Sequence, residues 1–216
     1  MRRLLAVGAL VLAGSVGSAQ ATTITFEDHA VPSGMANPIG GGGDLTSGGF
    51  FFDSATNDNQ LANNSANIDN GSTYLVIEGA LSQLNAFSQT TFSQIGGAPF
   101  ALTSIDYAKW QSAALAAATI TVTGNHVDGT TVVTTLSPGG IFGGPGGDFQ
   151  TFASGPDWAN LVSVVLSGTG ATFGTLNYFA IDNVVVDTAA VPEPGTLTLL
   201  GLGSAYLIRR RRRNRR

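Results

Sequence analysis

The chain has 216 residues and a formal net charge of −4, and all but one of its 10 Lys and Arg residues lie near its two ends. Residues 22–190 contain 13 of the 14 Asp and Glu residues, all except Glu193, against the single cation Lys109, which gives a net charge of about −12. Nucleic acid and anionic lipid are poor partners for this segment, because Lys and Arg must neutralise their phosphates, and we expect no nucleic acid to bind. No disulfide can stabilise the chain, which has no cysteine.

Residues 1–21 have the pattern of a secretion signal. Arg2 and Arg3 precede the apolar run 4–14, and the small residues that follow end in Ala19-Gln20-Ala21, an A-x-A cleavage site. As a helix, such a run of about 11 residues spans far less than the ~30 Å of hydrocarbon that a permanent anchor crosses. We therefore expect export through the Sec translocon and cleavage by signal peptidase after Ala21, rather than a helix that stays in the membrane.

The segment 22–190 has a length suited to one domain, and its pattern predicts β structure. Short runs rich in Thr, Val, Ile and aromatic residues are bounded by Gly, Asn, Asp or Pro. The clear runs are 22–26, 74–78, 119–123, 130–136, 161–167 and 178–186, and the weaker ones are 50–53, 87–92, 100–110 and 149–152. Alternation in 119–123 places Ile120 and Val122 on one face and threonines on the other.

About eight to ten short strands with glycine-rich turns predict an all-β fold, a sandwich of two antiparallel sheets. We favour a jelly-roll over an immunoglobulin topology. We expect residues 124–129 to form a hairpin loop, while the alanine-rich segment 111–118 fits either a helical turn or another strand. The Asn- and Asp-rich segment 54–71 lacks the spacing of a calcium loop, so we interpret it as a solvated loop.

No catalytic site is evident in the sequence. His29 and His126 are the only histidines, and neither belongs to a zinc or triad pattern. No G-x-S-x-G elbow is present. Trp110, Trp158 and Tyr107 could form stacking platforms for sugars, but large aromatic residues more often belong to the core. We expect a protein that is not an enzyme, with a secreted carbohydrate-active hydrolase as the alternative.

Two phrases at the ends of the domain indicate a metal ion. Residues 24–28 read Ile-Thr-Phe-Glu-Asp, and residues 178–184 read Tyr-Phe-Ala-Ile-Asp-Asn-Val. They resemble the first and last strands of carbohydrate-binding-module-like jelly rolls and galactose-binding-like domains. The resemblance implies a structural Ca²⁺ held by Glu27 and Asp182, and terminal strands that lie together could supply the oxygen ligands that Ca²⁺ needs. Asn183 stands where those modules often carry a second Asp, and a strand bulge at Asp182 with a loop cap at Glu27 is the alternative.

The last 26 residues form a second sorting signal. Val191-Pro192-Glu193-Pro194 precedes the apolar stretch 196–208, which predicts a short membrane helix, and seven of the last eight residues, 209–216, are arginine. The positive-inside rule keeps this cluster in the cytoplasm. The order of these features resembles the PEP-CTERM sorting signal. That resemblance implies an exosortase, a membrane peptidase that removes the tail 191–216. An ordinary tail anchor is the alternative.

The sequence thus predicts an exported envelope or extracellular-matrix protein with a transient inner-membrane anchor. Its parts are a signal peptide (1–21), a β-sandwich domain (22–190) and a PEP-CTERM tail (191–216). We expect the domain to associate with exopolysaccharide and to bind glycan and Ca²⁺, whereas a purely structural matrix protein would bind neither.

Overall fold

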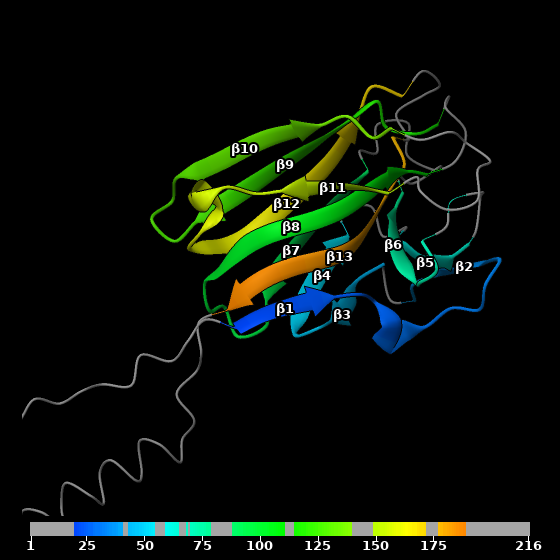
Figure 1. Cartoon of the computed structure of the whole chain (residues 1–216), viewed down its shortest axis with the longest axis horizontal. Helices are drawn as coiled ribbons and strands as arrows, with labels where there is room; N and C mark the ends of the chain where they lie inside the picture. The colour runs from blue at the N-terminus through cyan, green and yellow to red at the C-terminus, as the bar shows by residue number, and fades with distance from the viewer. Residues whose placement is uncertain are drawn as a thin grey trace, which may run out of the picture. The chain divides into compact units, whose positions relative to one another are not determined.

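A computed structural model of the chain (Figure 1) describes residues 20–40, 43–54, 59–64, 68, 70–78, 88–110, 115–139, 149–171 and 177–188. These residues belong to one unit, Gln20–Ala189. The predicted PEP motif, membrane helix and arginine cluster lie outside the described residues, as does the predicted signal up to residue 19. Within the described ranges, no helix is long and apolar enough to cross a membrane.

The described chain is built almost entirely of strands, which confirms the predicted all-β class. All ten predicted runs contain a strand, whereas the three- and four-residue strands β2, β3 and β5 were not predicted. The elements in chain order are β1 (Gln20–Ile24), η1 (Glu27–His29), β2 (Met35–Pro38), β3 (Leu45–Ser47), β4 (Phe50–Ser54), β5 (Gln60–Asn63), β6 (Tyr74–Ile77), β7 (Gln89–Gln94), β8 (Phe100–Lys109), β9 (Thr119–His126), β10 (Thr131–Leu136), β11 (Gln150–Ala153), η2 (Pro156–Trp158), β12 (Leu161–Thr169) and β13 (Phe179–Thr188).

The strands pair in two antiparallel ladders. One has the order β3-β4-β7-β12-β9-β10, and the other has the order β2-β5-β6-β13-β8-β11. Strand β13 pairs with β8 along one edge, and its other edge pairs with β6 over its first part and with β1 over its last part. The two ladders are joined where β12 pairs with β8, at Leu161 and Phe100. The result is one curled sheet (Figure 1).

Phenylalanine rings from both ladders meet in the main core. The ring of Phe100 on β8 lies 5.0 Å from that of Phe50 on β4 and 5.9 Å from that of Phe92 on β7. All three side chains are buried. Burying each such ring contributes about 1.5–3 kcal/mol, so this cluster holds the two ladders together.

A second apolar cluster covers the outer face of the ladder that contains β6, β13 and β8. It includes Tyr74 and Trp110, whose rings lie 5.9 Å apart, and the Trp110 indole N–H donates to Glu78 (2.8 Å). Strand β6 is therefore buried on both faces. Trp110 and Trp158 are both buried, and Tyr107 packs against the main core. The two tryptophans are therefore core residues, and Tyr107 is half-buried, so none of the three is a fully exposed stacking platform.

The hairpin between β9 and β10 is tighter than predicted. Strand β9 continues to His126, whose backbone N–H donates to the carbonyl of Thr130 (2.9 Å). Gly124 is still paired, with Val132 on β10 and Val164 on β12. The loop is therefore limited to residues 127–130, and the predicted loop 124–129 was wrong at its first three residues.

Close packing at Gly168 on β12 can be tested with an alanine. A Cβ atom there would clash with the backbone carbonyl oxygen of Asn177 and lie 3.0 Å from the ring of Phe179. We expect Gly168→Ala to lower the free energy of unfolding by about 1–3 kcal/mol in urea denaturation. Gly155→Ala is the control, because nothing lies within 4 Å of its Cβ position. Equal stability of the two variants would contradict this packing.

Candidate functional site

The first and last strands bring the two candidate metal ligands into one region. In the antiparallel pairing of β1 with β13, Ile24 lies opposite Val184 and Thr22 lies opposite Val186. The opening and closing phrases of the domain are therefore neighbours in space. Gln20 and Ala21 are the exposed start of β1, so cleavage after Ala21 would leave Thr22–Ile24 in the ladder.

Glu27 is placed by a sharp turn that follows β1. Phe26 has a left-handed backbone (φ 59°), which is rare for a bulky residue, and its fully buried ring contacts that of Phe52 at 5.2 Å. Burial of this ring therefore favours the turn into η1. The first residue of η1 is Glu27, and its Oε1 accepts a hydrogen bond from the backbone N–H of Thr73 (2.6 Å).

Asp182 is a buried acid at a bulge of β13. The pairing of β13 with β8 shifts after Asp182, where Asn183 has φ 44°. Asp182 Oδ2 accepts hydrogen bonds from the side chains of Asn70 (2.5 Å) and Ser72 (2.7 Å). Its Oδ1 is buried and has no partner among the described residues. Burial raises the pKa of Asp182 from 3.8 to about 6, although the hydrogen bonds from Ser72 and Asn70 oppose this effect.

Both candidate ligands thus contact the segment 70–73. Asp182 accepts hydrogen bonds from Asn70 and Ser72, and Glu27 accepts one from Thr73. Sequence reasoning missed this segment. The prediction that 54–71 is a solvated loop was also wrong, because these residues include strand β5 (Gln60–Asn63) and the buried side chains of Leu61, Ala62 and Ile68. Asn70 bonds the buried Asp182, and Asn59 is only 1% exposed. Asn and Asp are common in solvated turns, so their composition carried no signal of this contact.

The residues present fit a cation only in part. Asp182 Oδ1 is an uncommitted buried oxygen that either a proton or a cation would satisfy. Asp182 Oδ2 and Glu27 Oε1 already accept hydrogen bonds, and Asn183 donates to Asp106 (2.9 Å). Across the described part of the chain, no three His, Asp or Glu side chains gather to hold a metal ion. A Ca²⁺ ion here would need further oxygens from hydroxyl, amide or carbonyl groups.

Asp182 also predicts a pH dependence of stability. Its native pKa of about 6 lies above its ordinary value of 3.8, so the folded state binds the proton more tightly than the unfolded state does. The resulting stability is fully present below about pH 3.8 and is lost as the pH rises through 6, a change of roughly 3 kcal/mol. We expect Asp182→Asn to remove this dependence in urea unfolding measured between these pH values with chelator present.

Asp157→Asn is the control, because Asp157 is an exposed acid in η2. It should keep the pH dependence of the wild-type protein. A difference in stability between wild type and Asp182→Asn that is the same at every pH would contradict the raised pKa.

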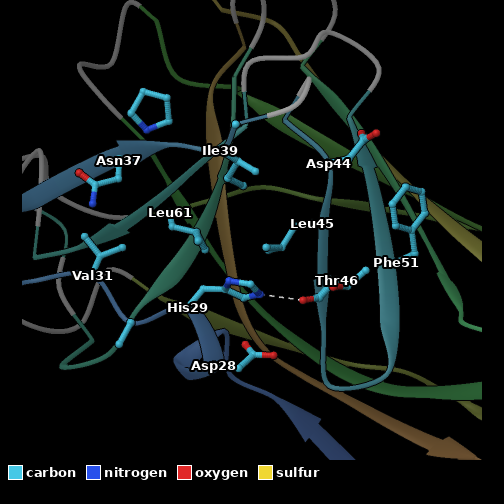
Figure 2. Close-up of a pocket in the computed structure, with 13 residues that line it drawn as sticks. Asp28, His29, Val31, Asn37, Ile39, Asp44, Leu45, Thr46, Phe51 and Leu61 are labelled. Carbon is cyan, nitrogen blue, oxygen red and sulfur yellow. Dashed lines mark hydrogen bonds between the residues drawn. The ribbon is translucent and has the colours of Figure 1, made fainter.

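A separate pocket of about 630 Å³ lies beside η1 (Figure 2). Its floor is apolar, and its rim is polar and includes two acids, Asp28 and Asp44. The pocket was not predicted from the sequence. The apolar lining residues include Val31, Ile39, Leu45, Phe51 and Leu61, and the polar ones are Asp28, His29, Asn37, Asp44 and Thr46.

Three of these rim side chains are each held by one hydrogen bond. Asp28 Oδ1 accepts from Ser47 Oγ (2.7 Å), and Asp44 Oδ1 accepts from the backbone N–H of Ser54 (3.0 Å). His29 Nε2 lies 2.8 Å from the carbonyl oxygen of Thr46 and is therefore the donor. Such a bond fixes the ring and leaves Nδ1 as an acceptor in a neutral imidazole.

Comparison with known proteins supports the reading of the tail. The family described as the PEP-CTERM protein-sorting motif matches residues 190–213. The chain therefore carries this motif, which marks an exported protein that an exosortase processes. No curated protein sequence matches the chain.

The solved structures that are similar to the chain include two with functions named in their descriptions. One is an exo-beta-agarase, with 12% identity and a TM-score of 0.43 over 81% of this chain, which spans only 25% of the agarase chain. The other is a family 11 carbohydrate-binding module from Clostridium thermocellum in complex with a beta-1,3-1,4-mixed-linked tetrasaccharide. It has 12% identity and a TM-score of 0.38, and the match covers 83% of this chain and all of the module.

Proposed function

We propose that the chain is a non-catalytic protein of the cell envelope or extracellular matrix that associates with exopolysaccharide after exosortase has removed its tail. The sorting motif at 190–213 is the observation that carries this proposal. In this proposal the Sec translocon and signal peptidase act first, the apolar stretch 196–208 is a transient anchor in the inner membrane, and the mature protein reaches the cell surface or the matrix.

We further propose that the domain is a jelly-roll sandwich. From β6 onward, successive strands alternate between the two ladders, apart from the hairpin of β9 and β10. Such alternation supports a jelly-roll topology, in which the chain crosses repeatedly from one sheet to the other.

The contacts of His29 argue against a serine hydrolase at this position. A serine hydrolase needs a serine that donates to a histidine base. Ser47 donates to Asp28, while His29 donates to the backbone carbonyl of Thr46. Ser47 is also buried, only 3% exposed, so a substrate would not reach it.

The processing route predicts both ends of the mature protein. Signal peptidase should leave Thr22 as the N-terminus, and exosortase should remove the arginine cluster 209–216. We expect intact-mass analysis of the protein from its native host to show both cleavages. In a host without exosortase the C-terminal tail should remain and keep the protein in the membrane. Recovery from the native host of a species that extends to Arg216 as the main product would contradict exosortase processing.

The proposed Ca²⁺ would be held by Glu27 and Asp182, and the orphan oxygen of Asp182 supports it. An ion that binds only the folded state raises the free energy of unfolding by about 2.7 kcal/mol at a hundredfold excess over Kd. We expect Tm to rise with added Ca²⁺ and to fall with EGTA. Asp182→Ala should remove this response, whereas Asp157→Ala should keep it. A wild-type Tm that is indifferent to EGTA would contradict the proposed Ca²⁺ site.

A further inference from the structure

We propose that the pocket beside η1 binds a protonated amino sugar, whose ammonium group is attracted by both Asp28 and Asp44. This inference rests on the proposed association with glycan and names the kind of sugar unit that the pocket takes. The pocket is separate from the contacts of Asp182, because neither Asp182 nor any residue of the segment 70–73 lines it.

The polar groups of the pocket are mainly hydrogen-bond acceptors. Carboxylates accept and do not donate, and the His29 ring uses Nε2 on Thr46. No Lys or Arg lines the pocket, and Lys109 is the single cation between residues 22 and 190. A ligand rich in donors and bearing a positive charge is therefore favoured, whereas a uronic acid is repelled.

The two carboxylates are held in place before any ligand binds. One oxygen of each carboxylate already accepts a hydrogen bond: Asp28 accepts from Ser47 Oγ, and Asp44 accepts from the Ser54 N–H. These bonds fix the orientation of the second oxygen of each carboxylate. Figure 2 shows the two acids on opposite sides of Leu45. Because these carboxylates are already ordered, less conformational entropy is lost when a ligand binds.

The apolar floor distinguishes a sugar from a bare cation. Val31, Leu45 and Leu61 are buried beneath the pocket, and Phe51 is 37% exposed at its side. A sugar ring can lay its C–H face on such a floor and direct its hydroxyls to Asn37 and the carboxylates. A bare metal ion would gain no binding energy from an apolar floor. In addition, the described residues include no group of three metal-binding side chains.

The inference can be tested with the processed protein and two matched probes. The first is an oligomer of glucosamine, and the second is the same oligomer with every amine acetylated, which removes the charge and keeps the ring hydroxyls. We expect calorimetry to show tighter binding of the free amine by about fivefold, the scale of one exposed ion pair, with a loss of this preference at high salt.

Variants of the acids locate the binding. Asp44→Asn and Asp28→Asn each keep an Oδ1 acceptor for the Ser54 or Ser47 donor, so the fold should survive, which unchanged melting curves would verify. Each should weaken binding of the free amine by about threefold to fivefold. Asp157→Asn removes the same charge from η2, away from the pocket, and should leave the affinity unchanged.

The following results would overturn the inference. Equal affinity for the two oligomers would show that the amine is not recognised, and equal losses in Asp44→Asn and Asp157→Asn would show general attraction to an acidic domain. If neutral or acidic glycans bind while the amino sugar does not, only the present inference fails. If no glycan of any charge binds, the proposed association with exopolysaccharide fails with it.

Discussion

The pairing of β1 with β13 is the constraint on which both candidate sites depend. It places the start of the domain beside the last strand, with Ile24 opposite Val184, and the buried ring of Phe26 then turns the chain into η1. From η1, Glu27 contacts Thr73, and the next two residues, Asp28 and His29, line the pocket. No cysteine reinforces this arrangement, and strand pairing, apolar burial and the hydrogen bonds of Glu27 and Asp182 to the segment 70–73 hold the ends of the domain together.

Acidic residues serve different purposes in the two sites. Asp182 is fully buried beside an apolar cluster, where desolvation raises its pKa and makes its charged form costly. Asp28 and Asp44 are exposed, so water solvates their charge and only one oxygen of each needs a protein partner. In the two proposals, the first arrangement responds to protons or cations by a change in stability, whereas the second recognises a ligand without a change in the fold.

The strands were predictable where β-branched and aromatic residues are dense, as in β9 and β13. The short strands β2, β3 and β5 were not, because each has only three or four residues and no run of β-branched or aromatic residues. In addition, β2 and β5 pair with each other although they lie far apart in the sequence. Glu27 and Asp182 were chosen as candidate ligands from their place in two sequence phrases. The partners of Asp182 were not, because Ser72 lies 110 positions away and only the folded chain brings it near.

The place of β13 in its ladder bears on how the protein would carry mechanical load. Antiparallel hydrogen bonds run across the strands, so a pull along β13 from its C-terminal end would load many of them at once. Strand β13 is bonded to β8 on one edge and to β6 and β1 on the other. A domain tethered to a surface by its C-terminal end would thus resist traction in shear across both edges instead of unzipping one pair at a time.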